Sequence, residues 1–139
     1  MTIIAAVNHS REGRLALVAA VAEARQLGTD LVVVNLGHEQ VDVTDLDTDA
    51  VTVSVVDRRG KDKEHSAGAV IDEIAARQAT RLVIGVRRRT PVGKAILGSL
   101  SQRLLFDSPV PVLAVKLPKG ELPSSTFDDL PAGMRRVTG

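Results

Sequence analysis

The stretch RLVIGVRRRTPVGKAILGSLS, residues 81–101, decides the fold. It opens with a short apolar run that ends at Gly85, which is typical of a buried parallel strand. A loop with three consecutive arginines follows, and a helix over residues 99–107 can begin after Gly98. Ser99 is expected to cap that helix, because a serine hydroxyl accepts a hydrogen bond from one of the first helical N–H groups. Backbone amides and the helix dipole favour negative charge there, so we predict a phosphate site for a nucleotide.

The composition indicates one soluble globular domain. The chain has 139 residues, 44% of them hydrophobic and 25% charged, which is enough to bury a core. A net charge of +1 gives no general attraction to nucleic acid or acidic membranes, and an aromatic content of 1% disfavours stacking of single-stranded bases. The absence of cysteine excludes disulfides and thiolate metal sites. No basic leader is visible and the apolar stretch 15–22 is too short to span a bilayer, so we expect a cytoplasmic protein.

Apolar runs and helical spacing predict the first elements. Residues 2–7 indicate a first buried strand, and residues 31–36 (LVVVNL) a second. Between them, a helix over residues 11–27 is expected to begin after its cap Ser10 and to stop at Gly28. The residues expected on its core face are Leu15, Val18, Ala22 and Leu27.

The later elements follow from the same signals. Residues 37–50 are acidic and show no period, so a helix in this second crossover is expected to be short or absent. Residues 51–56, from Val51 to Val56, suit an edge strand whose direction stays open, because the connection is near the minimum length for a parallel crossover. Helices are predicted over residues 65–79 and 99–107, and a last strand over residues 110–116 (VPVLAVK). The residues predicted to face the core from these two helices are Ala67, Val70, Ile71, Ile74 and Ala75, and Leu100, Leu104 and Leu105.

Alternating strands and helices predict an α/β fold, an open and mostly parallel five-stranded sheet with helices on both faces. In such sheets a ligand binds beyond the carboxyl ends of the strands, where the strand order reverses. Residues 118–139 contain several prolines and glycines and are expected to form an extended tail, docked on the body or on a partner subunit.

The chain resembles the universal stress protein family, whose fold closes with a glycine, two residues, a glycine, nine residues and then Gly-Ser or Gly-Thr. Gly85 matches the first position and Gly98-Ser99 the last pair, while Arg88 replaces the second glycine. The resemblance covers roughly residues 2–116 and implies a domain at 1–117 with strand order 3-2-1-4-5, Rossmann-like and similar to adenine nucleotide alpha hydrolases. It also implies an adenine nucleotide, ATP or AMP, as ligand, with Mg²⁺ accompanying a triphosphate.

The resemblance also implies which residues contact the nucleotide. Asn8 stands where nucleotide-binding relatives commonly carry an aspartate, although Asn8-His9-Ser10 is equally well explained as a strand-to-helix turn. One arginine guanidinium can donate two hydrogen bonds to the oxygens of a phosphate. The side chain of Arg88 either blocks the approach of phosphate to the backbone or supplies such a donor. The expected nucleoside contacts are Val7, Asn8, Leu36 and Ile84, and the expected phosphate contacts are Gly85, Arg87, Arg88, Gly98, Ser99, Leu100 and Ser101.

Other motifs carry no function. Gly93-Lys94 lacks the remaining residues of a P-loop, and no Gly-x-Gly-x-x-Gly follows the first strand. The acidic residues 45–49 imitate a calcium loop, but Ala50 and Val56 stand where glycine and glutamate are needed, so a solvated loop is favoured. The three histidines lack metal-ligand spacing, and no catalytic arrangement is apparent, so neither a metal site nor dedicated catalysis is expected.

The last strand suggests a partner. Its outer edge, from Val110 to Lys116, is apolar, and relatives pair through this strand, so a homodimer is expected. The alternative is that the tail covers this edge. Two further functions stay open: a family member that binds no nucleotide and acts through its dimer and tail surfaces, or a small phosphohydrolase or transferase on the same sheet.

Overall fold

A computed structural model describes residues 1–44, 46, 48–58, 65–87 and 98–117 of the chain. The tail predicted at 118–139 and Arg88 lie outside the described residues. The elements are β1 (Thr2–Val7), α1 (Arg11–Leu27), β2 (Asp30–Asn35), β3 (Val53–Asp57), α2 (Ser66–Ala76), β4 (Arg81–Gly85), α3 (Ser99–Asp107) and β5 (Val112–Val115). Among the described residues, no helix has the length and apolar character needed to cross a membrane.

The five strands form one sheet in the order β3-β2-β1-β4-β5, and every neighbouring pair is parallel. The predicted fold class and strand order are therefore confirmed. The direction of β3, which the sequence left open, is parallel to β2, with Leu31 beside Val53. The described part of the crossover between β2 and β3 contains no helix. Apolar side chains of this segment, Val41, Val43, Leu46 and Val51, pack on the core in place of a helix.

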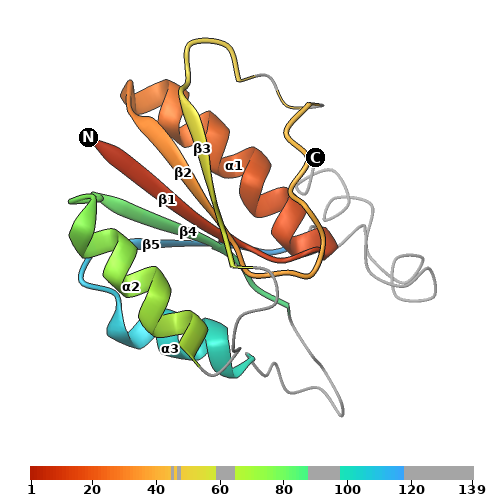
Figure 1. Ribbon diagram of the computed structural model, residues 1–139, viewed down its shortest axis with the longest axis vertical. Helices are drawn as coiled ribbons and strands as arrows, with labels where there is room; N and C mark the ends of the chain where they lie inside the picture. Colours follow the sequence, from red (N-terminus) through yellow and green to blue (C-terminus); the bar gives the residue numbers. More distant parts are fainter. Residues whose placement is uncertain (45, 47, 59–64, 88–97, 118–139) are drawn as a thin grey trace, which may run out of the picture.

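The sheet separates two layers of helix, with α1 on one face and α2 and α3 on the other (Figure 1). Successive strand residues point to opposite faces, so each strand contributes to two cores. In β1, Ile3, Ala5 and Val7 belong to the core under α1, whereas Ile4 and Ala6 belong to the core under α2 and α3. This burial on both faces explains why the central strands are continuous apolar runs.

The core face predicted for α1 is wrong, because the helix turns a neighbouring set of positions toward the sheet. Val18 and Leu27 are 46% and 42% exposed, while the buried positions are mostly small: Ala16, Leu17, Ala20, Val21 and Ala24. A surface of alanines lets the helix axis approach the strands closely, and this approach buries more of β1 and β4 than larger side chains would allow. The spacing of the largest apolar residues therefore pointed to the wrong face.

Several predicted element ends also move by one to three residues. β2 begins and ends one residue earlier than expected, and β3 begins at Val53 because Val51 packs into the core before the strand starts. α2 ends at Ala76 instead of 79, since Gln78 has a positive φ of 51°. Within α2, Ala75 is exposed, while Ala67, Val70 and Ile74 are buried as predicted. β5 is shortened to Val112–Val115, although the Pro111 carbonyl still accepts a hydrogen bond from the Leu82 N–H.

α3 has the predicted bounds but a different cap. Gly98 is the N-cap residue in extended conformation, its carbonyl accepts from the Gln102 N–H at 2.9 Å, and no side chain caps this helix. Ser99 is thus the first helical residue, and its predicted role as N-cap is wrong. Leu104 is buried, and Leu100 and Leu105 pack partly buried against the same core.

Candidate functional site

A pocket of about 600 Å³ opens at the carboxyl ends of β1 and β2. Its walls are the residues that follow β1, the first two turns of α1, and residues 39–42 after β2. Arg87, which follows β4, completes the wall. The connections that leave β1 and β4 cross opposite faces of the sheet, so the pocket lies beside the point where the strand order reverses.

The lining combines an apolar part with charges of both signs. Val7, Leu17 and Val41 supply apolar surface. Three arginines, Arg11, Arg14 and Arg87, and two carboxylates, Glu39 and Asp42, surround it. Apolar surface with a few convergent polar groups is the usual composition of a small-molecule site.

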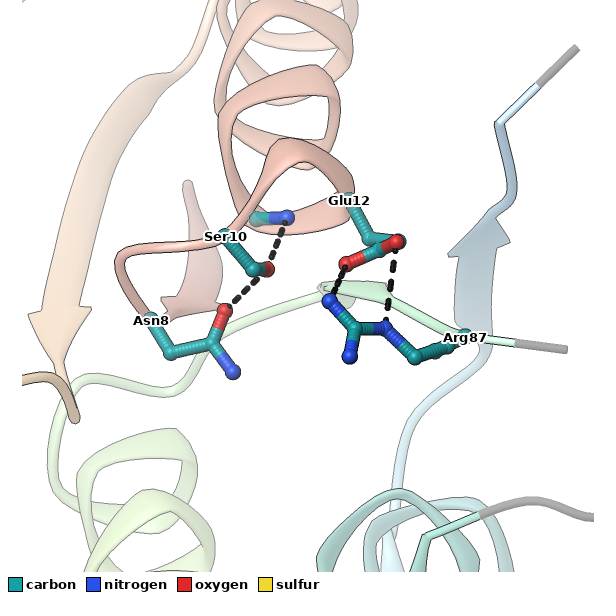
Figure 2. Close-up of polar contacts among 5 residues, drawn as sticks. Asn8, Ser10, Glu12 and Arg87 are labelled. Carbon is teal, nitrogen blue, oxygen red and sulfur yellow. Dashed lines mark hydrogen bonds and ion pairs between the residues drawn. The ribbon is translucent and has the colours of Figure 1, made fainter. Parts of the chain in front are cut away.

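The first turn of α1 packs tightly on the ends of β1 and β4. Ser10 caps the helix as predicted: its Oγ accepts a hydrogen bond from the Gly13 N–H at 3.0 Å and donates to Asn8 Oδ1 at 2.5 Å (Figure 2). A Cβ at Gly13 would lie 2.3 Å from the Asn8 carbonyl oxygen, and a Cβ at Gly85 would lie 2.4 Å from the Glu12 carbonyl oxygen. Only glycine fits at these two contacts, so Gly85 has a packing role that the sequence analysis missed.

The wall formed by residues 39–42 is held by a buried asparagine. Asn35 is 2% exposed; its Nδ2 donates to the Glu39 carbonyl at 2.8 Å, and its Oδ1 accepts from the Gly37 N–H at 3.0 Å. Further along, Arg14 donates to the carbonyl oxygen of Asp42. These bonds connect the end of β2 and the second turn of α1 to the segment that closes the pocket.

An ion pair joins α1 to the residue after β4 beside the pocket. The Glu12 carboxylate accepts from Arg87 Nε at 3.4 Å and from Arg87 Nη2 at 3.5 Å (Figure 2). Burial raises the pKa of Glu12, but hydrogen bonds from its own backbone N–H and from Arg87 offset this and hold the pKa below its ordinary value. Glu12 is therefore ionised at neutral pH.

Of the residues predicted to contact a nucleotide, Val7, Asn8 and Arg87 line the pocket. Leu36 and Ile84 pack on the opposite face of the sheet from Val7, so a ligand touching all three would lie across the strand ends. Gly85 lies under the first turn of α1. Leu100 packs on the core under α2 and α3, and Gly98, Ser99 and Ser101 begin α3 on that same face, with Gly98 and Ser99 exposed. Contact between these residues and a nucleotide stays a prediction.

The sequence analysis did not select several residues of this wall: Arg14, Leu17, Asn35, Glu39 and Asp42. Asn35 carried a readable signal, since it is a polar residue closing an apolar run at the carboxyl end of a parallel strand. Arg14 and Leu17 would have followed from the cap at Ser10, because residues one and two turns into a helix share a face with its start. The described residues contain no group of three His, Cys, Asp or Glu side chains that could hold a metal ion.

The fold and the position of the pocket define a class: open, parallel α/β proteins with a ligand pocket at the strand ends. The model of the Universal stress protein family matches residues 38–116 of the chain. The chain is also 36% identical over 118 residues to a Universal stress protein of Mycolicibacterium smegmatis, across 75% of this chain and 88% of the relative. This protein therefore belongs to the universal stress protein family.

Solved structures agree with this fold. A universal stress protein from Archaeoglobus fulgidus superposes with a TM-score of 0.64 at 22% identity, over 84% of this chain and 98% of the other. A structure of the A. fulgidus protein in complex with dAMP superposes with a TM-score of 0.57 at 22% identity over the same shares. These identities support the shared fold and no more.

Proposed function

We propose that this protein binds an adenine nucleotide, ATP or AMP, at the pocket beside β1, as a stress-response module without dedicated catalysis. The observation that carries the proposal is the pocket itself: about 600 Å³ at the strand ends, with Arg87 and two further arginines among its lining residues. A volume of this size suits a ligand as large as a nucleotide.

The lining supports a division of the ligand between two regions. The apolar surface of Val7, Leu17 and Val41 suits a base or sugar, and the side-chain amide of Asn8, which lines the same pocket, suits a polar group of that base or sugar. Arg87 suits the phosphate, because one guanidinium can donate two hydrogen bonds to phosphate oxygens. The predicted phosphate contacts at Gly98, Ser99 and Ser101 would require the ligand to extend toward the start of α3.

The fold relatives support the same ligand class. A dAMP complex exists for the A. fulgidus protein, whose fold this chain shares. Mg²⁺ would accompany only a triphosphate. Among the described lining residues, the carboxylates are engaged elsewhere: Glu39 pairs with His9 at 3.0 Å, and Asp42 accepts from the Thr44 N–H and hydroxyl. These contacts provide no built metal site, so the proposal does not depend on a metal.

Calorimetric titration tests the proposal. We expect AMP and ATP to bind the wild-type chain with measurable heat, and Arg87→Ala to weaken AMP binding about tenfold. A charge-assisted hydrogen bond contributes about 1.5–3 kcal/mol, and the lower end applies because Arg87 is largely exposed to solvent. Adenosine, which lacks the phosphate, is expected to bind wild type and Arg87→Ala equally.

The controls separate the remaining functions. No heat from millimolar AMP or ATP would contradict the proposal and favour a family member that binds no nucleotide. The hydrogen bond that Ser10 donates to Asn8 is consistent with that alternative, because it makes Asn8 part of a simple turn. Multiple-turnover release of phosphate from ATP that disappears in Arg87→Ala would instead indicate a phosphohydrolase.

We also propose a homodimer through the outer edge of β5. In the described structure β5 is the edge strand beside β4. The carbonyls of Pro111 and Val115 accept from the N–H groups of Leu82 and Val86 in and after β4. Because backbone groups alternate along a strand, those of Val112 and Ala114 point away from β4, where a second copy can pair with them.

A proline at position 114 tests this interface. Ala114→Pro removes an outward N–H without removing a bond to β4, and each symmetric pair of lost bonds weakens a dimer by about tenfold or more. Analytical ultracentrifugation should show a dimer for wild type and for the control Ala114→Ser, and a monomer at the same concentration for Ala114→Pro. A wild-type monomer would contradict the dimer and leave the alternative that the tail covers β5.

A further inference from the structure

We propose that Glu12 determines how strongly the pocket accepts anions, because it holds Arg87 in an ion pair that an incoming phosphate has to replace. The inference rests on the proposed function, since it concerns the same arginine and the same pocket. Glu12 is not among the described residues that line the pocket, so it acts through Arg87 and is a positioning residue.

The first step concerns the burial of Glu12. Its side chain is only 8% exposed, and it lies in the first turn of α1, where a Cβ on Gly85 would touch its backbone. Its carboxylate accepts from Arg87 Nε and Nη2. A carboxylate this buried retains its charge only beside cationic and donor groups. Arg87 is therefore the counter-ion that Glu12 needs.

The second step concerns the geometry of the pair. The two contacts, at 3.4 and 3.5 Å, are longer than the 2.7–2.9 Å typical of charge-assisted hydrogen bonds. The Arg87 side chain is 60% exposed. Figure 2 shows one guanidinium nitrogen turned away from Glu12. Arg87 is thus held loosely, at the edge of the pocket, by a partner that cannot move far from α1.

The third step concerns the charge around the pocket. The described lining residues carry three arginines and two carboxylates. Glu12, directly behind Arg87, brings this small group of charges to balance. An anion that contacts Arg87 then gains attraction from one guanidinium but meets repulsion from the Glu12 carboxylate a few ångströms behind it. The gain from the phosphate group alone is therefore small.

The consequence is that the phosphate group alone binds weakly and that binding needs further contacts with the pocket. Inorganic phosphate interacts with the pocket only through its charged oxygens, so it has to compete with Glu12 for Arg87. A phosphate attached to a nucleoside also contacts the apolar and amide groups of the pocket, so it can bind despite the competition. Glu12 thereby makes binding depend on the nucleoside and disfavours small inorganic anions.

The chain offers a matched control. Glu23 and Arg81 form a second glutamate–arginine pair between α1 and β4, at the opposite end of the strand from the pocket. Glu12→Gln and Glu23→Gln remove the same charge from the same helix. Only the first removes it beside Arg87.

The experiment is a titration of the full chain with inorganic phosphate, and separately with AMP and adenosine, followed by amide shifts in NMR spectra. In Glu12→Gln we expect the Kd for inorganic phosphate and for AMP to fall about threefold, the size found for partly exposed ion pairs. Adenosine binding is expected to stay unchanged, and Glu23→Gln is expected to match wild type. In an Arg87→Gln background, Glu12→Gln should give no gain, because the charge acts through Arg87.

The outcomes separate the two proposals. An unchanged or weaker phosphate affinity in Glu12→Gln, or an equal gain in the Arg87→Gln background, would overturn the role of Glu12. A phosphate gain that depends on Arg87, with no AMP binding in wild type, would support Glu12 and reject the proposed function. If Glu12→Gln does not fold, Glu12→Asp keeps the charge but draws it back from Arg87, and a smaller gain in phosphate affinity is expected; no gain would overturn the inference.

Discussion

Gly85→Ala is expected to lower the free energy of unfolding by about 3 kcal/mol, the upper part of the usual range for overpacking a buried contact. The added Cβ would lie 2.4 Å from the Glu12 carbonyl oxygen, 2.5 Å from the Glu12 carbonyl carbon and 2.9 Å from the Gly13 nitrogen. All three atoms belong to the backbone of α1, so no rotamer change relieves the contact. The helix has to move away from β4, and the core that they share has to loosen.

Urea unfolding followed by circular dichroism measures this effect. Gly68→Ala is the control, because nothing lies within 4 Å of a Cβ at Gly68, which is inside α2. Alanine is favoured over glycine in a helix interior, so this variant is expected to gain about 0.5–1 kcal/mol. Equal stability of Gly85→Ala and wild type would show that α1 does not pack on β4 as described.

Asn35→Ala is expected to cost about 2 kcal/mol and to loosen the wall of the pocket. The substitution leaves the buried Gly37 N–H and the Glu39 carbonyl without the two bonds that Asn35 makes at 3.0 and 2.8 Å. An unsatisfied buried polar group costs about 1–3 kcal/mol, which sets the expected size. Since residues 39–42 line the pocket, AMP affinity should fall together with stability.

Backbone amide hydrogen exchange over residues 37–42 checks where the effect occurs. Faster exchange is expected in this segment of Asn35→Ala, with slow exchange retained in β1 and β4. Gln40→Ala is the control on the same wall, because Gln40 is exposed, and its stability should stay within about 0.5 kcal/mol of wild type. Unchanged exchange at Gly37 in Asn35→Ala would contradict the anchoring role of Asn35.

The sequence was most informative where one local signal is enough. The cap at Ser10 and the stop at Gly28 both have the predicted role, since capping depends on only a few neighbouring residues. The apolar runs of β1 and β4 identified two buried strands with correct ends. At α3 the same reasoning chose Ser99 as the cap, one residue late, because serine and glycine both suit that position and backbone conformation decided between them.

Local sequence signals could not predict the core face of α1 or the residues that form the pocket wall. Val18 and Leu27 fit a helical spacing but stay exposed, because the sheet selects the side of the helix that approaches most closely, and that side carries alanines. Arg14 is distant in sequence from Asn35 and Asp42, and the three come together only when β2 lies beside β1.

Taken by itself, then, the order of residues determined the alternation of strands and helices, the family, and the end of the sheet where charged residues collect. Those properties depend on the spacing of apolar side chains, on helix caps and on short motifs, all of which are determined by residues close together in the sequence. Tertiary structure alone decided that β3 runs parallel to β2, that Gly85 supports α1, and that Glu12 pairs with Arg87. Each of these is a contact between segments distant in sequence, and its geometry exists only after the sheet has brought the segments together.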